Sequence, residues 1–132
     1  MHWTHINQPI LSIPVGNHKR LYGFVYKITN IQTNRSYIGC KSFFSTTTKT
    51  IDGKKRKITS ESNWLDYYSS STELKADVKK LGKEQFTREI LQFCSSKDEM
   101  LYMEAKWQFE LEVLESSKWY NRWISYKGRY LK

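Results

Sequence analysis

The stretch LYGFVYKITNIQTNRSYIGCK, residues 21–41, decides the fold because it places two apolar runs on either side of a polar turn. The runs at 22–29 and 36–40 are rich in aromatic and β-branched residues, and 30–35 supplies turn chemistry, so the sequence predicts a β-hairpin. Tyr26 and Tyr37 lie eleven residues apart, one in each expected strand. Two such aromatics need no role beyond packing, so their function must be judged from the rest of the chain.

Length, composition and charge narrow the class of protein. A chain of 132 residues is about one domain and buries enough surface to fold without disulfides. With 39% hydrophobic and 15% aromatic residues, and only 6 Gly and 2 Pro, a globular core is expected rather than disorder. A net charge of +9 favours polyanionic partners, with nucleic acid first and an anionic membrane surface or RNA next. A solvated basic surface is the alternative.

The cysteines and the N-terminus indicate a soluble protein of a reducing compartment. Cys40 and Cys94 fit neither a metal-ligand spacing nor a disulfide framework. No window approaches eighteen apolar residues and no signal sequence is evident, so a cytoplasmic location without membrane contact is expected. Residues 1–20 lack helical periodicity and predict an extended arm or cap that joins the domain at Leu21. The histidines of this segment, including His18, match no standard metal site.

Two basic segments are candidates for contact with nucleic acid. Residues 44–62 are mostly Thr, Ser, Lys and Arg around Asp52-Gly53, which predicts a protruding loop or small hairpin. The C-terminal residues interleave basic and aromatic side chains, and 124–132 form a tail. Such segments can follow phosphates and stack on bases, or can simply be solvated. The candidate residues are Lys49, Lys54, Lys55, Arg56 and Lys57 in the insertion and Lys118, Arg122, Lys127, Arg129 and Lys132 near the C-terminus.

Two helices and a third strand are expected between these segments. Ser70 and Glu73 resemble a capping box at the start of a short amphipathic helix that ends before Gly82. The apolar run 86–94 predicts a buried strand. A second box, Ser96 and Glu99, opens a helix expected from Lys97 to Leu114.

Glu104 breaks the pattern of that last helix. An apolar stripe at helical spacing contains Met100, Met103, Trp107, Leu111 and Leu114, and Glu104 falls on it. Burying an unpaired carboxylate costs several kcal/mol, so the position predicts an Arg or Lys partner or a bound cation. A glutamate at the edge of the stripe, paired with a surface lysine, is the simpler reading.

Together these residues resemble the GIY-YIG nuclease family, which includes phage homing endonucleases, some restriction enzymes and the incision domain of excision-repair nucleases. The first half of the signature is present as Gly23-Phe24-Val25-Tyr26, with the glycine displaced by one residue, and the second half, Tyr37-Ile38-Gly39, is intact. Glu104 and Asn121, which follows Tyr120, align with the family's glutamate and C-terminal asparagine. The resemblance spans residues 21–123 with one insertion, and 64–91 is similar to the small phage-encoded members.

The resemblance implies an α+β domain with a three-stranded, mostly antiparallel sheet flanked by helices. It implies a metal-dependent endonuclease acting on double-stranded DNA, as a monomer or homodimer, in a bacterial host cell if phage-encoded. Glu104 would bind Mg²⁺ or Mn²⁺, Tyr26 would be the general base, Tyr37 would position the water or the phosphate, and Asn121 would complete the site.

The chain departs from the family at one catalytic position. The family usually carries an arginine on the helix after the second motif, whereas the corresponding positions here hold Thr47, Thr48 and Lys49. Lys41 is the expected substitute, with Lys49 and Arg56 as alternatives, although a lysine is not equivalent to the bidentate arginine. A catalytically weak nucleic-acid-binding module and a structural phage protein are therefore the alternatives to an active nuclease.

Overall fold

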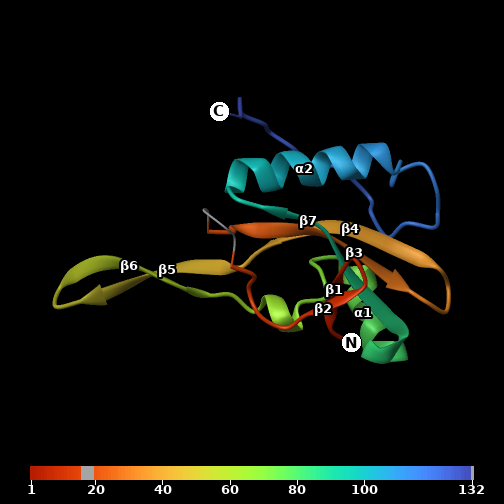
Figure 1. The fold of residues 1–132 in the computed structure, drawn as a ribbon, viewed down its shortest axis with the longest axis horizontal. Coiled ribbons are helices and arrows are strands. Elements are labelled where there is room, and N and C mark those ends of the chain that lie inside the picture. Colours follow the sequence, from red (N-terminus) through yellow and green to blue (C-terminus); the bar gives the residue numbers. More distant parts are fainter. Residues whose placement is uncertain (16–19, 132) are drawn as a thin grey trace.

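The computed structural model describes residues 1–15 and 20–131, which form a five-stranded sheet with one long helix on each face and a separate two-stranded hairpin (Figure 1). The sheet order is β2-β1-β7-β3-β4. Its strands are β1 (Trp3–His5), β2 (Gln8–Ile10), β3 (Gly23–Asn30), β4 (Arg35–Ser42) and β7 (Phe86–Cys94). The helices are α1 (Thr72–Leu81) and α2 (Lys97–Glu110), with 3₁₀ turns η1 (Trp64–Asp66) and η2 (Lys83–Gln85).

The predicted hairpin is the centre of the sheet. β3 and β4 pair antiparallel, with Tyr26 opposite Gly39 and Ile28 opposite Tyr37, and the turn between them is 31–34. β7 pairs antiparallel with the other side of β3. These are the three strands expected from the sequence, and the α+β class is confirmed.

The N-terminal residues extend this sheet instead of forming a separate arm. β1 pairs parallel with β7, Trp3 opposite Arg88, and β2 pairs antiparallel with β1, so the sheet has five strands where three were expected. Trp3 is 1% exposed, and its ring lies 5.1 Å from Phe24 and 5.4 Å from Tyr26. This burial holds the segment on the core, a contact that the proline- and histidine-containing sequence did not reveal. His18 lies outside the described residues.

The two faces of the sheet carry separate apolar cores. The face under α1 and η1 is the larger and the face under α2 the smaller, because strand residues alternate between them. The α1 face includes Trp3, Phe24, Tyr26, Ile28, Phe43, Trp64, Leu74, Phe86 and Ile90. The α2 face includes Val25, Ile38, Cys94, Met100 and Val113. Tyr26 therefore lies on the face opposite α2.

The start of α1 differs from the prediction by one residue. Ser71, not Ser70, is the N-cap, and its hydroxyl accepts from the Leu74 amide at 3.2 Å. Glu73 does not close a capping box, because its carboxylate binds arginines from two other segments. Gly82 is the C-cap at φ 94°, as the sequence indicated.

The predicted helix after Ser96 is shorter than expected. Ser96 caps α2 by accepting from the Glu99 amide at 3.1 Å, as predicted. The helix ends at Glu110, however, and the chain then turns, with Glu112 at φ 55°. Leu111 and Leu114 are consequently exposed, so the buried stripe stops at Trp107.

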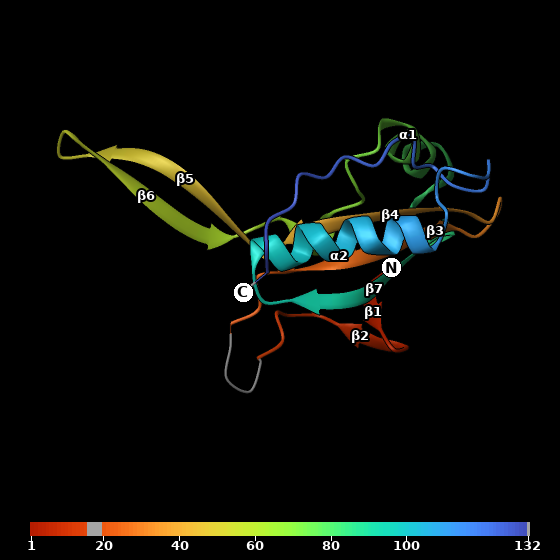
Figure 2. The same ribbon diagram turned by 90° about the horizontal axis from the view of Figure 1, so that it is seen from above.

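The basic insertion is a β-hairpin that projects from the body of the domain (Figure 2). Its strands are β5 (Phe44–Ile51) and β6 (Lys54–Glu61), paired antiparallel. Asp52 and Gly53 connect them at φ 52° and 75°, the positive values of a type I′ turn.

Candidate active site

Tyr26 lies in the middle of β3, opposite Gly39 on β4. Its side chain is 1% exposed and crosses over the glycine, where a Cβ atom would lie 2.5 Å from the phenol oxygen. A β-bulge separates Val25 from Tyr26 in the pairing with β7, and bulges of this kind re-aim side chains near functional sites. The glycine of the second motif thus provides the space in which Tyr26 lies.

Three tyrosines surround this point on the α1 face. The ring of Tyr26 lies 6.2 Å from that of Tyr37 and 6.1 Å from that of Tyr67, which follows η1. The side chain of Ser70 lowers the pKa values of both Tyr37 and Tyr67, which places it beside them. Sequence reasoning missed Tyr67 and Ser70, because the segment between η1 and α1 has no periodicity that could indicate which side chains turn inward.

Burial governs the ionisation of the tyrosines. Loss of solvation raises the pKa of Tyr26 well above its ordinary value, and the neighbouring Tyr67 and Tyr37 raise it further. Burial also raises the pKa values of Tyr37 and Tyr67, although the hydrogen bond with Ser70 opposes this in both. Tyr26 is therefore a neutral phenol at neutral pH in the free protein.

Glu104 lies on the buried side of α2, with its carboxyl group against Cys40 of β4. Burial raises its pKa, while hydrogen bonds with the thiol and main chain of Cys40 oppose the rise. Within residues 1–15 and 20–131 the ion pairs are those of Glu73, so Glu104 has no Arg or Lys partner there. The sequence predicted either an Arg or Lys partner or a bound cation for this carboxylate. Since the described residues supply no such side-chain partner, a bound cation is the alternative that remains.

The carboxylate of Glu104 is an oxygen ligand of the kind that hard divalent cations such as Mg²⁺ and Mn²⁺ prefer. No group of three or more His, Cys, Asp and Glu side chains gathers in the described part of the chain. Mg²⁺ is commonly held by one or two carboxylates together with water and substrate phosphate oxygens, so a single half-buried carboxylate is sufficient. Glu104 is the residue in this site that could supply it.

Glu104 and the tyrosines approach one another across β4, the last strand of the sheet. Glu104 comes from the α2 side and Tyr37 from the α1 side. Burial is the main cause of the raised pKa values of Tyr26, Tyr37 and Tyr67, and the charge of Glu104 adds to the rise in each.

Asn121 secures the outer edge of β4 beside this site. Its side-chain oxygen accepts from the Ile38 amide at 3.0 Å, and its side-chain nitrogen donates to the Ile38 carbonyl at 2.9 Å. Gln108 of α2 donates to the same carbonyl, and residues 118 and 120 pair with Ser36. Asn121 is 7% exposed and commits both polar atoms to the backbone next to Tyr37.

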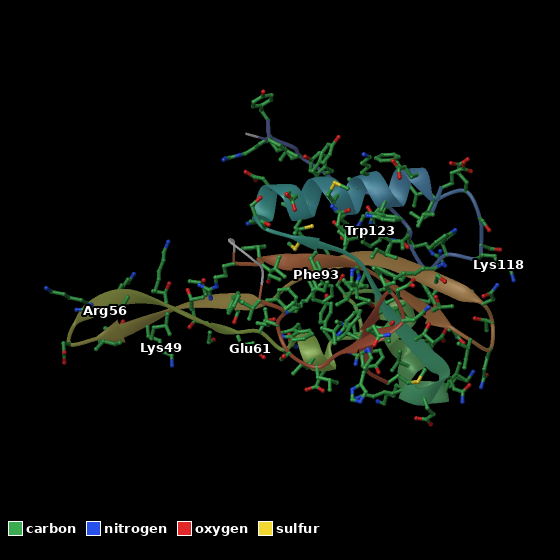
Figure 3. All side chains as sticks on the ribbon, in the orientation of Figure 1. Lys49, Arg56, Glu61, Phe93, Lys118 and Trp123 are labelled. Carbon is green, nitrogen blue, oxygen red and sulfur yellow. The ribbon has the colours of Figure 1, made fainter. Side chains whose placement is uncertain are left out.

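Of the three candidate substitutes for the family arginine, Lys41 lies at the tyrosine cluster. Its ammonium nitrogen is 4.4 Å from the ring centroid of Tyr67, and burial lowers its pKa. Lys49 and Arg56 lie opposite each other on the β5–β6 hairpin, away from the sheet (Figure 3).

A cavity of about 300 Å³ opens beside Tyr37. Arg122 at its rim donates to Glu73 at 2.6 Å and 2.9 Å, and Arg35 donates to the same carboxylate at 2.8 Å. Trp123, 73% exposed, lines the same cavity. The cavity is lined by Tyr37, Ser70, Glu73, Tyr120, Asn121 and Trp123, among others.

The tail beyond residue 123 leaves the tyrosines and follows α2. Tyr126 packs edge-on against Tyr102 of α2, and Arg129 shares a cavity with Asp98 and Glu99 at the start of that helix. Lys127 and Arg129 are exposed on this layer, while Lys132 lies outside the described residues. The candidate nucleic-acid-binding residues therefore fall into three groups, where two segments were expected: the hairpin, Arg122 at the cavity beside Tyr37, and the residues along α2.

A family model described as "Putative endonuclease segE, GIY-YIG domain" matches residues 3–124. The chain belongs to the GIY-YIG endonuclease family. The match begins within β1, so the N-terminal strands are part of the family domain. Membership implies DNA as the substrate class and the use of divalent metal ions in general. No curated protein and no solved structure matches the chain. Among the described residues, neither helix has the length and apolar character needed to cross a membrane.

Proposed function

We propose that this protein is a metal-dependent endonuclease that hydrolyses phosphodiester bonds in double-stranded DNA. The observation that carries the proposal is that Tyr26 and Tyr37 pack together at β4 with their rings 6.2 Å apart, while the half-buried Glu104, which has no Arg or Lys partner among the described residues, lies against Cys40 of the same strand. A structural role alone would not require an uncompensated carboxylate beside three tyrosines, because each raises the cost of ionising the others.

In this proposal the tyrosines handle the attacking water. Tyr26 accepts its proton in the tyrosinate form, after losing its own phenol proton to solvent, and Tyr37, which is partly exposed, positions the water or the scissile phosphate. Attack forms a bond from the water oxygen to phosphorus and breaks the bond to the leaving 3′ oxygen. Asn121 acts indirectly, by holding the Ile38 backbone and with it the strand that carries Tyr37.

Glu104 would hold a divalent cation, Mg²⁺ or Mn²⁺. When bound, the ion supplies a Lewis acid for the nonbridging and leaving oxygens and cancels the negative charge that opposes ionisation of the tyrosines.

Lys41 is proposed as the cation that replaces the family arginine at the phosphate. Its position above Tyr67 supports this choice, because neither Lys49 nor Arg56 lies near the tyrosines. The phosphates farther along the DNA would be bound by Lys49, Lys54, Lys55, Arg56 and Lys57 of the hairpin and by Arg122, Lys127 and Arg129.

Incubation of supercoiled plasmid with the protein tests the activity. Nicking or linearisation is expected with Mg²⁺ or Mn²⁺, none with EDTA, and none with the Glu104→Ala variant under any condition. Cleavage that persists in EDTA or in Glu104→Ala would remove Glu104 and its cation from the mechanism.

A DNA-binding module without cleavage is the second candidate. Two observations favour it: the raised pKa of Tyr26, and Thr47, Thr48 and Lys49 in place of the expected arginine. Retarded DNA on a native gel, without cleavage in Mg²⁺, Mn²⁺ or Co²⁺, would make it the better description.

A further inference from the structure

The β5–β6 hairpin carries charge that the rest of the protein does not neutralise. Its five cations face only two acids within its own strands and turn, Asp52 and Glu61. Neither ion pair of the described residues involves the hairpin. Lys49 lies directly opposite Arg56, an arrangement of like charges that destabilises a strand pair.

The hairpin also has almost no apolar support of its own. Along both strands the residues are exposed, apart from the partly buried Phe44 and Ile58. Isolated two-stranded hairpins are marginal in water. An external polyanion would relieve the repulsion and order the ribbon.

The pairing register gives the ribbon two faces of different chemistry. Residues paired across an antiparallel ribbon share a face, and neighbours along a strand alternate. One face, here called the threonine face, carries Thr46 with Thr59, Thr48 with Lys57 and Thr50 with Lys55. The other, the isoleucine face, carries Thr47 with Ile58, Lys49 with Arg56 and Ile51 with Lys54.

The threonine face is the one that continues toward the tyrosines. A cavity of about 580 Å³ at the base of the hairpin is lined by Arg20, Lys41, Phe44, Ser45, Thr46 and Thr59, among others. Phe44, Thr46 and Thr59 belong to the threonine face, and Lys41 contacts Tyr67. A DNA strand bound at Lys41 would therefore continue onto the threonine face of the hairpin.

The ribbon has the dimensions of a major-groove reader. Two strands about 4.8 Å apart, with their side chains, fit a groove about 12 Å wide, and eight residues extend roughly 27 Å. Threonine offers a hydroxyl to any base edge and a methyl group to thymine, whereas lysine reaches phosphate or guanine. On the threonine face the threonines of β5 lie opposite Lys55, Lys57 and Thr59 of β6.

We propose that the β5–β6 hairpin enters the major groove of duplex DNA, with its threonine face against the base edges and the cations of the isoleucine face at the phosphates of the groove walls. The inference rests on the proposed nuclease function for its substrate class. It goes beyond that function because it assigns sequence preference to named side chains outside the catalytic residues.

The chain offers a matched pair of variants that test the face. Thr48→Val and Thr47→Val are adjacent, exposed and nearly isosteric, remove one hydroxyl each and retain strand propensity. Each threonine variant is combined with Glu104→Ala in the full-length protein, so that DNA is bound without being cut. Each protein is then used to select ligands from a randomised duplex library. We expect Thr48→Val to change the preference at one base position by about five- to tenfold, and Thr47→Val to select the parental sequences.

Charge variants test whether the hairpin touches DNA. Replacing Lys49 and Lys54 of the isoleucine face by alanine is expected to reduce the slope of log K against log salt by about 2, because each phosphate contact contributes about 0.9. The matched Lys55→Ala/Lys57→Ala variant, on the face toward the base edges, should reduce the slope less. Single-stranded DNA, which has no major groove, should bind without any effect of Thr48→Val.

The proposal is overturned if Thr47→Val changes the selected sequences instead, or if neither threonine variant changes them. It is also overturned if Thr48→Val affects the binding of single-stranded DNA equally, or if the slope of log K against log salt stays the same in both lysine variants. Failure of the nuclease proposal is a separate result. Wild-type protein that never cuts DNA, together with the expected Thr48→Val effect, would remove the enzyme activity and leave the hairpin assignment standing.

Discussion

The phenol of Tyr26 occupies the space that a side chain at Gly39 would need, 2.5 Å from the position of the missing Cβ. The two signature motifs thus interlock across β3 and β4. We expect Gly39→Ala to displace the tyrosine, lower the free energy of unfolding by about 1–3 kcal/mol in urea titrations, and abolish cleavage. Tyr26→Phe is the control, because it removes the hydroxyl yet should retain most of the stability. A Gly39→Ala protein with wild-type stability and cleavage would contradict the interlock.

Glu104→Gln should stabilise the metal-free protein at neutral and alkaline pH. The pKa of Glu104 is raised in the folded state, so the wild type loses stability as pH rises from the ordinary range of a glutamate through the folded value. Glutamine still accepts a hydrogen bond but never ionises. Melting in EDTA should show a gain on the order of 1 kcal/mol at pH 8 that vanishes near pH 4.

Mg²⁺ gives the complementary result, since it should raise the melting temperature of the wild type and leave Glu104→Gln unchanged. Equal melting of both proteins at all pH values, with and without Mg²⁺, would show that this carboxylate is neither strained nor a metal ligand.

Cleavage should accelerate with pH well into the alkaline range. Burial keeps the pKa of Tyr26 above its ordinary value, so the tyrosinate fraction, and with it the rate of proton removal, continues to increase. We expect log kcat/KM to rise without a plateau below pH 9, and Tyr26→Phe to leave only a low, pH-independent rate. A plateau at pH 7 in the wild type would assign the base to another group.

Asn121→Ala should act through stability rather than through chemistry. The variant leaves the Ile38 amide without a partner at a buried site, which costs about 1–3 kcal/mol. Cleavage should fall in proportion to the loss of order in β4, and Asn121→Asp should be worse, since its carboxylate faces the Ile38 carbonyl. Full stability with complete loss of cleavage would instead give Asn121 a direct role at the phosphate.

Lys41→Ala should reduce kcat about a hundredfold, while Arg56→Ala should weaken binding a few-fold, mainly at low salt. The difference follows from their positions, one above Tyr67 and the other on the hairpin. Lys41→Arg should recover part of the rate. Equal, slight losses from Lys41→Ala and Arg56→Ala would eliminate Lys41 as the electrophile.

The elements built from local patterns could be predicted from the sequence. β7 has the predicted bounds, and the turns at 31–34 and Asp52-Gly53 follow from their residue types. Contacts distant in sequence could not be predicted. Trp3 pairs with Arg88, and the side chain of Tyr67 packs against Tyr26. Both contacts depend on which parts of the folded core remain accessible, and a local sequence pattern carries no information about that. Glu104 was found because it interrupts a periodicity, whereas Ser70 and Cys40 interrupt none.

Covering the outer edge of β4 has a consequence for self-association. An exposed edge strand is a template on which another chain can add a strand, the route to domain swapping and fibrils. Here 118–121 cover β4, and the opposite border is β2, three residues long with Pro9 at its centre. The ribbon of β5 and β6 has open edges, but the positive charge of its lysines repels the same hairpin of another molecule. Although its sheet is built of long-range pairings, the protein thus presents its neighbours with few places where a strand could be added.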